Sequence, residues 1–441
     1  MKTFLRAFVT CGLGLATLSG VAQKPESLVL ISIDGMKPEY VTKADDHGLK
    51  IPELRSFLKQ GTYADGVQGV VPTVTYPSHT TIVTGVWPAQ HGVFNNTTFD
   101  PMEEHPGQWY WDFHDIKVPT LYTAADAAGL KTGSVSWPVT IGAPIDYNIA
   151  EGAQSERTDL SPQSPYNPSD ILAQLGLPAP ENTDEFRTRE AVGILSKWHP
   201  QLMMVHLVLL DHQEHEHGPF SAEANAELEK IDGDVREIEE AARKANPHTR
   251  IVIVSDHGFL PVEHHVNLNV AMVENGFVKL APAKKQRKHP KVESWTAAMW
   301  PSGGIATIVV KNNDPAVTAQ VAAMLAKLKA DPANGIERVL TQDEIAKRGG
   351  FPPASFLIDF KDTYSEGANF FGPLVTPAPH TGTHGYLSDR PALRSTFMVK
   401  GDGIAKGKDV GVIDMRQIAP TLAELIGVKL PDAKLKPVNV K

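Results

Sequence analysis

The sequence predicts an α/β fold in which helices cover a mostly parallel central sheet, with a small α+β insertion late in the chain. Near-continuous apolar runs alternate with helical patterns, which is typical of buried parallel strands. Four successive apolar runs are each followed by a reactive polar residue, where open α/β sheets place their ligands. The 441 residues, 41% of them hydrophobic, suffice for one large domain with an insertion, or for two domains.

The first 22 residues have the pattern of a signal peptide. Lys2 and Arg6 precede an apolar run over 7–18, and residues 20–22 supply a small-residue cleavage pattern. Because this run is too short to cross a bilayer comfortably, we expect a periplasmic or secreted protein with no stable membrane span after cleavage. An uncleaved anchor is the alternative.

Cysteine content and net charge exclude several kinds of active site and binding partner. Cys11 is the only cysteine and lies in the leader, so the mature chain has no disulfide, thiolate metal ligand or cysteine nucleophile. Removal of Lys2 and Arg6 takes the formal charge from −9 to −11. This acidic balance argues against binding nucleic-acid polymers or acidic membranes. A small phosphate substrate would need local positive charge, for which metal ions are the obvious source.

The predicted catalytic core covers residues 26–264 and 375–430. Residues 138–182 are rich in Pro, Ser, Asp and Asn, which indicates a loop. We expect strands at 27–33, 130–137, 202–210, 250–254 and 395–400, and helices at 51–60, 119–129, 185–197, 222–244 and 416–426.

Residues 265–374 interrupt this alternation and are predicted to form the inserted α+β subdomain. Strands are expected at 304–310 and 355–360, with a helix over 314–329 between them. The basic run KKQRKHPK is expected to be a solvated loop, although it could also draw anionic substrates inward. This insertion could cover the predicted ligand site at the strand ends.

The stretch VVPTVTYPSHTTIVTG, residues 70–85, supplies a candidate nucleophile. A helix is expected to begin at Pro77, because proline suits the first helical position. Thr75 comes just before it, where a hydroxyl faces free N–H groups and a partial positive charge. Thr75 could attack phosphorus, while Asn96 and the backbone N–H after Thr75 would hold a phosphate oxygen. A plain structural cap is the alternative reading of Thr75.

Carboxylates and imidazoles form a first candidate metal set. Asp211 and His215 are four residues apart across an expected polar turn, and His384 lies far downstream. Two histidines and one carboxylate are a usual zinc arrangement with an open position. The alternatives are His212 or His217 in place of His215, and His380 in place of His384.

A second set comprises Asp34, Asp256 and His257, with the Thr75 hydroxyl as fourth ligand. Nitrogen and oxygen ligands without sulfur suit zinc, with manganese or iron as alternatives. Two such ions can clamp the attacking and leaving oxygens at phosphorus. Five other histidines are expected to be structural or on the surface: His79, His91, His206, His264 and His265.

The motifs ISIDGM, TYPSHTTIVTG, HGVFNN, SWP, D-x-x-x-H-x-x-G-P, SDHGF and THGY occur in this order. The chain thereby resembles the nucleotide pyrophosphatase/phosphodiesterase family of the alkaline phosphatase superfamily, over about 28–427. The resemblance implies an alkaline-phosphatase-like three-layer sandwich and cleavage of phosphodiesters or pyrophosphates through a phosphothreonine. It also implies Thr75 as nucleophile, Asn96 as phosphate-binding amide, one zinc on Asp211, His215 and His384, and the other on Asp34, Asp256, His257 and Thr75.

Departures from the family pattern bear on substrate. Ser78 replaces a usual asparagine. Of the two positions that the resemblance assigns to base stacking, Tyr76 fills the first but His206 stands at the second. The stretch SWPVTIGAP lacks the lysine and arginine of related monoesterases, which favours a diester or nucleotide substrate. The alternatives are a phosphomonoesterase or phosphonate hydrolase and a non-catalytic, metal-stabilised binding protein.

Overall fold

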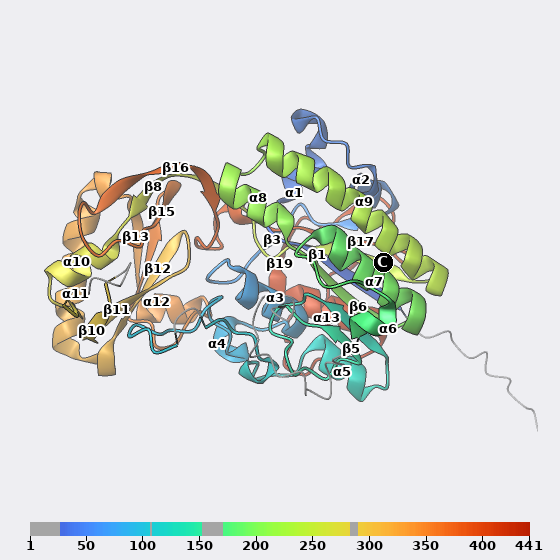
Figure 1. Cartoon of the computed structure of the whole chain (residues 1–441), viewed down its shortest axis with the longest axis horizontal. Helices are drawn as coiled ribbons and strands as arrows, with labels where there is room; N and C mark the ends of the chain where they lie inside the picture. Colours follow the sequence, from blue (N-terminus) through green and yellow to red (C-terminus); the bar gives the residue numbers. More distant parts are fainter. Residues whose placement is uncertain (1–26, 106–107, 152–170, 283–289) are drawn as a thin grey trace, which may run out of the picture.

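The computed structural model describes residues 27–105, 108–151, 171–282 and 290–441 (Figure 1). Its central sheet has eight strands in the order β18-β2-β17-β7-β1-β6-β4-β5. All neighbours pair in parallel except β17, which is antiparallel to β7 and β2, so the predicted mostly parallel sheet is confirmed. The strands are β1 (Leu28–Ile33), β2 (Gly61–Tyr63), β4 (Thr132–Val135), β5 (Tyr147–Ile149), β6 (Leu202–Leu207), β7 (Arg250–Val254), β17 (Phe397–Lys400) and β18 (Lys408–Asp409).

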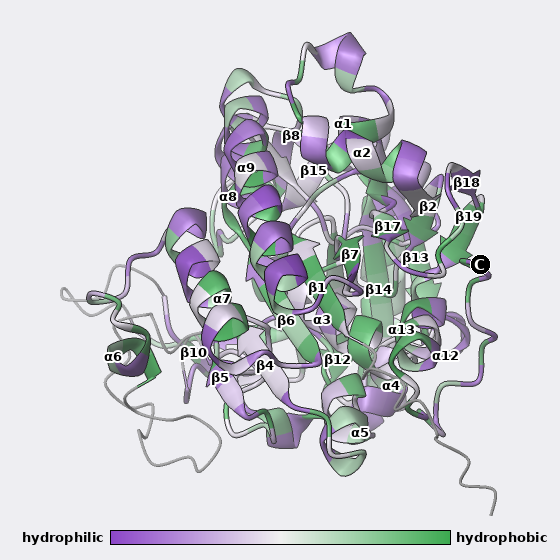
Figure 2. Cartoon of the chain, turned by 90° about the vertical axis from the view of Figure 1, so that its right-hand side faces the viewer, coloured by the Kyte–Doolittle hydropathy of each residue, from purple (hydrophilic) through white to green (hydrophobic). Residues whose placement is uncertain are grey.

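Helices cover both faces of this sheet and complete a three-layer sandwich (Figure 2). Val29 and Ile31 of β1 belong to one hydrophobic cluster, whereas Leu28 and Leu30 belong to the other. Successive strand side chains point to opposite faces, so a strand buried on both faces must be apolar throughout. One face packs against α2 (Pro52–Gln60), α7 (Asp184–Trp198) and α9 (Ala222–Ala245), and the other against α3 (Thr75–Thr84), α5 (Leu121–Ala127) and α13 (Ile418–Ile426).

One predicted boundary near the site is wrong because a distant residue starts a helix. The expected strand over 202–210 ends at Leu207, and α8 (Leu209–His217) follows. The Asp184 carboxylate accepts hydrogen bonds from the N–H groups of Val208 and Leu209, at 3.0 and 2.9 Å. It thus satisfies N–H groups that a helix start leaves without partners. Asp211 therefore lies in the first turn of α8, and the expected polar turn before His215 is helical.

A second boundary, that of α3, also differs from expectation. The helix begins at Thr75 rather than at Pro77. Proline is tolerated here because its missing N–H falls among those that a first turn leaves unbonded. The Thr75 hydroxyl is consequently part of the first helical turn.

The insertion has its own hydrophobic cluster and lies beside the core in Figure 1. The chain leaves the core along β8 (Leu260–Val266) and returns along β16 (Val375–Thr383), and these strands pair antiparallel. A four-stranded antiparallel sheet follows the order β11-β12-β14-β13: Ala297–Pro301, Ile305–Val310, Phe356–Phe360 and Ile336–Thr341. Helix α11 (Pro315–Ala330) matches the expected helix.

The shorter elements complete the chain. They are α1 (Pro38–Thr42), α4 (Pro88–His91), α6 (Ile171–Leu175), α10 (Leu268–Glu274), α12 (Gln342–Lys347), β3 (Gly66–Gln68), β9 (Val278–Leu280), β10 (Val292–Trp295), β15 (Thr363–Glu366) and β19 (Val412–Asp414). Within the described ranges, no helix combines the length and apolarity needed to span a bilayer. The predicted leader and most of the basic run lie outside the described residues.

Candidate metal centre and nucleophile

The predicted ligand-bearing segments meet at the carboxyl edge of the central sheet. Asp34 follows β1, Asp256 and His257 follow β7, and His384 follows β16. Among the described residues, two groups bring their ligand atoms within 4.8 Å of one another: Asp34, Asp256 and His257, and Asp211, His257 and His384. The sequence placed His257 in one set only, whereas the structure places it in both groups.

Short distances connect the two groups through His257. Its Nε2 lies 3.3 Å from Asp34 Oδ1, 3.1 Å from Asp256 Oδ2 and 4.0 Å from Asp211 Oδ1. His384 Nε2 lies 3.7 Å from the same Asp211 oxygen. The rings of His257 and His384 stack with centroids 3.6 Å apart. Segments separated by hundreds of residues therefore form one compact cluster.

His215 borders this cluster, unlike its predicted alternatives. Its Nδ1 lies 3.1 Å from the Gly382 carbonyl oxygen, and its Nε2 lies 3.5 Å from Asp211 Oδ1. A carbonyl partner on one ring nitrogen orients the other toward a ligand position. His212 and His217 instead approach Glu216 on the exposed side of α8. The side chain of His380 lies outside those that the structure describes.

Electrostatics show that the cluster fits bound cations. Burial, reinforced by the negative charges of Asp256 and Asp211, raises the pKa of Asp34 well above its usual range. Burial and Asp211 raise the pKa of Asp256 to about 8. Asp34 Oδ1, Asp211 Oδ1 and Asp256 Oδ2 are buried without a hydrogen-bond partner among the described residues. Buried carboxylate oxygens beside neutral imidazoles need positive charge, and this sulfur-free donor set suits divalent cations.

Thr75 lies beside the cluster, and Asn96 is hydrogen-bonded to the residue that follows Thr75. Thr75 Oγ1 is 3.5 Å from His257 Nε2, at the start of α3. Asn96 Oδ1 accepts a hydrogen bond from the Tyr76 N–H at 2.9 Å. This bond corrects one expectation, because the N–H after Thr75 holds the Asn96 amide rather than pointing at a phosphate oxygen. It fixes the Asn96 side chain against the backbone of Tyr76, the residue that follows the predicted nucleophile.

The two residues predicted to contact substrate are fully buried. The Tyr76 ring packs against Trp109 and Trp111, with centroids 5.2 and 5.8 Å apart. His206 Nε2 lies 2.9 Å from Asp34 Oδ2. The structure therefore places His206 directly behind a candidate metal ligand.

Sequence reasoning missed the supporting role of another histidine. His79, expected to be structural, lies with one ring nitrogen 2.8 Å from the Thr75 carbonyl and the other 2.9 Å from Ser32 Oγ. It also approaches Asp256 Oδ2 at 3.6 Å. The available signal was its spacing, since a residue four positions after Thr75 on a helix lies on the same face.

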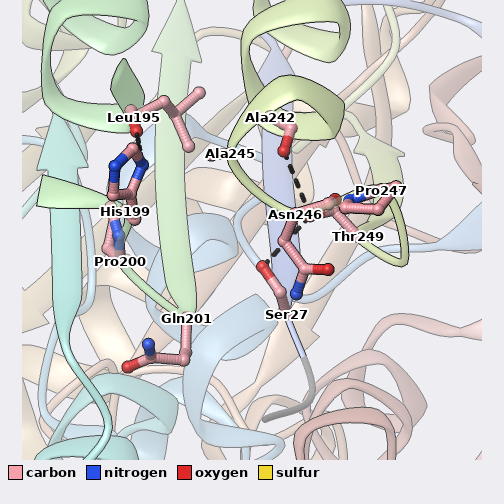
Figure 3. Close-up of a pocket in the computed structure, with 10 residues that line it drawn as sticks. All are labelled: Ser27, Leu195, His199, Pro200, Gln201, Ala242, Ala245, Asn246, Pro247 and Thr249. Carbon is pink, nitrogen blue, oxygen red and sulfur yellow. Dashed lines mark hydrogen bonds between the residues drawn. The ribbon is translucent and has the colours of Figure 1, made fainter. Parts of the chain in front are cut away.

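Two cavities differ in their relation to the cluster. One of about 260 Å³ lies among Ser27, Gln201 and Thr249 (Figure 3), residues that precede β1, β6 and β7, whereas Asp34 and Asp256 of the cluster follow β1 and β7. Another, of about 220 Å³, begins at Thr97, one residue beyond Asn96, and extends to Trp300 of the insertion. Of these two cavities, the second is lined by the residue that follows the predicted phosphate-binding Asn96.

Family comparison agrees with this geometry. A family model described as type I phosphodiesterase/nucleotide pyrophosphatase matches residues 28–389. The chain belongs to this enzyme family, within the alkaline phosphatase superfamily.

Individual relatives are more distant. Human ectonucleotide pyrophosphatase/phosphodiesterase family member 1 is 27% identical over 242 residues, which cover 52% of this chain and 23% of the human protein. A Schizosaccharomyces pombe pyrophosphatase/phosphodiesterase is 25% identical, covering 53% of this chain and 45% of its own length. The chain thus spans less than half of these relatives.

Solved structures confirm the fold over almost the whole chain. Human ectonucleotide pyrophosphatase/phosphodiesterase 5 superposes with a TM-score of 0.66 and 19% identity, covering 92% of this chain and 96% of its own. An inactive variant of the murine protein, in complex with AMP, gives a TM-score of 0.65 at 18% identity, with the same coverage.

Proposed function

We propose that this chain is an exported dizinc hydrolase that cleaves phosphodiester or phosphoanhydride bonds through a phosphothreonine at Thr75. The observation that carries the proposal is the position of the Thr75 hydroxyl. It lies at a helix start, 3.5 Å from Nε2 of His257, the residue common to both candidate metal groups. A structural cap would not need this proximity to a residue that both candidate metal groups share.

The ligand assignment follows the two groups except that His215, whose Nε2 lies 3.5 Å from Asp211 Oδ1, takes the place of the shared His257 in the second. Asp34, Asp256, His257 and the Thr75 hydroxyl would hold one zinc, and Asp211, His215 and His384 the other. When bound, the two ions supply positive charge that lowers the pKa of the Thr75 hydroxyl and offsets charge on the leaving oxygen. Manganese and iron are alternatives for the same nitrogen and oxygen donors.

The reaction divides into two displacements at phosphorus. Thr75 Oγ forms a bond to phosphorus as the bond to the leaving alcohol or phosphate oxygen breaks. The threonine proton leaves to solvent, and the leaving alcohol oxygen takes a proton from solvent. Water then attacks the phosphothreonine and loses a proton to solvent, while the bond from phosphorus to Oγ breaks and Oγ takes up a proton. The Asn96 amide, oriented by its hydrogen bond from the Tyr76 N–H, donates from Nδ2 to a non-bridging oxygen in both steps.

A diester or nucleotide is the favoured substrate class. Residues 136–144 supply no lysine or arginine for the extra charge of a monoester. A cavity that begins at Thr97, the residue after Asn96, is a candidate place for an ester arm of the substrate. The AMP complex of the murine relative supports a nucleotide among the substrates to be tried.

The test compares Thr75→Ala and Thr75→Ser with the parent protein on bis(p-nitrophenyl) phosphate and p-nitrophenyl phosphate. We expect Thr75→Ala to lose turnover by orders of magnitude while keeping bound zinc, and Thr75→Ser to keep some turnover. Acid quench and mass spectrometry should find phosphate on the peptide that contains Thr75. A monoesterase would prefer the second substrate, and a binding protein would turn over neither. Unchanged turnover in Thr75→Ala would refute the proposed nucleophile.

Export has a separate test. We propose cleavage after Ala22 because residues 1–22 carry the leader pattern. Amino-terminal sequencing of protein recovered from the periplasm or medium should begin near Gln23. Recovery of uncleaved protein in the cytosol would contradict this.

A further inference from the structure

His206 is a buried polar ring in an otherwise apolar strand. It belongs to the β6 segment LMMVHL, is completely buried, and pairs in register with Ser32 of β1. An imidazole in such a place costs free energy unless its nitrogens have partners. One partner is Asp34, whose Oδ2 lies 2.9 Å from Nε2.

The other ring nitrogen is held by a rigid part of the core. His206 Nδ1 lies 3.1 Å from the carbonyl oxygen of Ser136, which follows β4. Ser136 adopts φ 53°, a left-handed conformation that is uncommon for serine. Arg187 Nε donates to Ser136 Oγ at 3.3 Å, and Arg187 is itself hydrogen-bonded to Asp184. His206 is therefore fixed on the side away from the cluster.

The two carboxylate oxygens of Asp34 face different partners, His206 on one side and the candidate metal cluster on the other. Oδ2 faces His206, while Oδ1 is buried without a hydrogen-bond partner among the described residues and lies 3.3 Å from His257 Nε2. The neighbouring carboxylate is held differently, because Asp256 Oδ1 accepts from the Gly35 N–H at 3.2 Å. Asp34 thus depends on a side chain for the orientation that Asp256 obtains from the backbone.

We propose that His206 is a positioning residue that holds the Asp34 carboxylate with Oδ1 turned toward a divalent cation. This inference rests on the proposed cation site but not on the chemistry of Thr75. Residues behind metal ligands typically change metal affinity by about 10- to 100-fold when they are replaced. His206 should therefore influence one of the two ions through Asp34 without touching substrate.

The test measures zinc affinity by competition with a chromophoric chelator. In His206→Leu we expect one zinc to bind about 10- to 100-fold more weakly, whereas His206→Gln, which keeps an N–H donor, should fall between Leu and the parent. The matched control is His91→Gln. His91 is equally buried but contacts Thr81 and the Val93 N–H, so its replacement should leave both zinc affinities unchanged.

Kinetics on bis(p-nitrophenyl) phosphate give a second readout. His206→Leu should lower kcat at limiting zinc with little change in KM, and excess zinc should restore most of the loss. If folded His206→Leu and His206→Gln both bind two zinc ions as tightly as the parent, the inference is overturned. Turnover that survives Thr75→Ala, together with weakened zinc binding in His206→Leu, would refute the proposed nucleophile and leave this inference intact.

Discussion

Replacement of Asp184 should reveal how the fold holds the ligand-bearing helix α8. Its carboxylate is 1% exposed and accepts the N–H groups of Val208 and Leu209. It also accepts a hydrogen bond from Arg187 Nη1 at 3.0 Å. In Asp184→Ala these bonds are lost together, and the Arg187 guanidinium, 7% exposed, loses its carboxylate partner.

The expected cost is large because a buried charge is left behind. Removal of one partner of a buried ion pair costs about 3–5 kcal/mol. Burial raises the pKa of Asp184 in spite of the opposing effect of Arg187, which places the expected loss near the lower end, at about 3 kcal/mol. Asp314 is the matched control, because it caps α11 through two N–H groups at 2.8 and 3.1 Å on an exposed surface. Asp314→Ala should cost about 1 kcal/mol.

Urea unfolding of the two variants measures this difference in the free energy of unfolding. Asp184→Ala should also bind zinc more weakly, because the first turn of α8 carries Asp211, whereas Asp314→Ala should bind zinc normally. If Asp184→Ala costs no more than Asp314→Ala and leaves zinc affinity unchanged, the supporting role assigned to Asp184 is refuted.

Two further outcomes test electrostatics and packing elsewhere. Burial raises the pKa of Glu366 from 4.5 to about 8, so its contribution to stability is present below pH 4.5 and is lost as the pH rises through 8. Glu366→Gln should therefore flatten the pH dependence of the urea midpoint between pH 5 and 9, and an unchanged slope would contradict this. In Gly304→Ala, the added Cβ would meet Tyr386 Cγ at 2.1 Å, which should lower the free energy of unfolding by about 1–3 kcal/mol. The control is Gly233→Ala in α9, where the added Cβ meets nothing within 4 Å and should raise the free energy of unfolding by about 0.5–1 kcal/mol. Thermal unfolding of the two variants measures both changes.

The position of the site could be predicted because parallel strands carry their ends to one edge. Asp34 directly follows a largely apolar strand and Asp256 comes two residues after another, so the sequence marks both the strands and the polar residues just beyond them. The same reasoning found Thr75 at a helix start. Those signals are local, and they needed no knowledge of which strands are neighbours.

Features that depend on distant contacts could not be predicted in this way. The start of α8 is set by Asp184, more than twenty residues upstream, and the apolar letters of residues 207–210 fit a strand equally well. Likewise, the participation of His257 in both groups depends on the approach of His384 from the far side of the insertion. His206 was visible as a histidine within an apolar run, but its partner Asp34 was not.

Residues of the insertion help to hold the candidate metal ligand His384 in position. His384 comes directly after β16, which is held in register by β8 on the outgoing side of the insertion. The turn between β11 and β12 packs on the same residue, since the Gly304 N–H donates to the His384 carbonyl oxygen at 2.8 Å. A Cβ at Gly303 would come within 2.3 Å of that oxygen, so only glycine permits this approach. Because strand pairing and a close backbone contact both fix His384, the geometry of the second candidate ion depends on correct folding of the inserted residues.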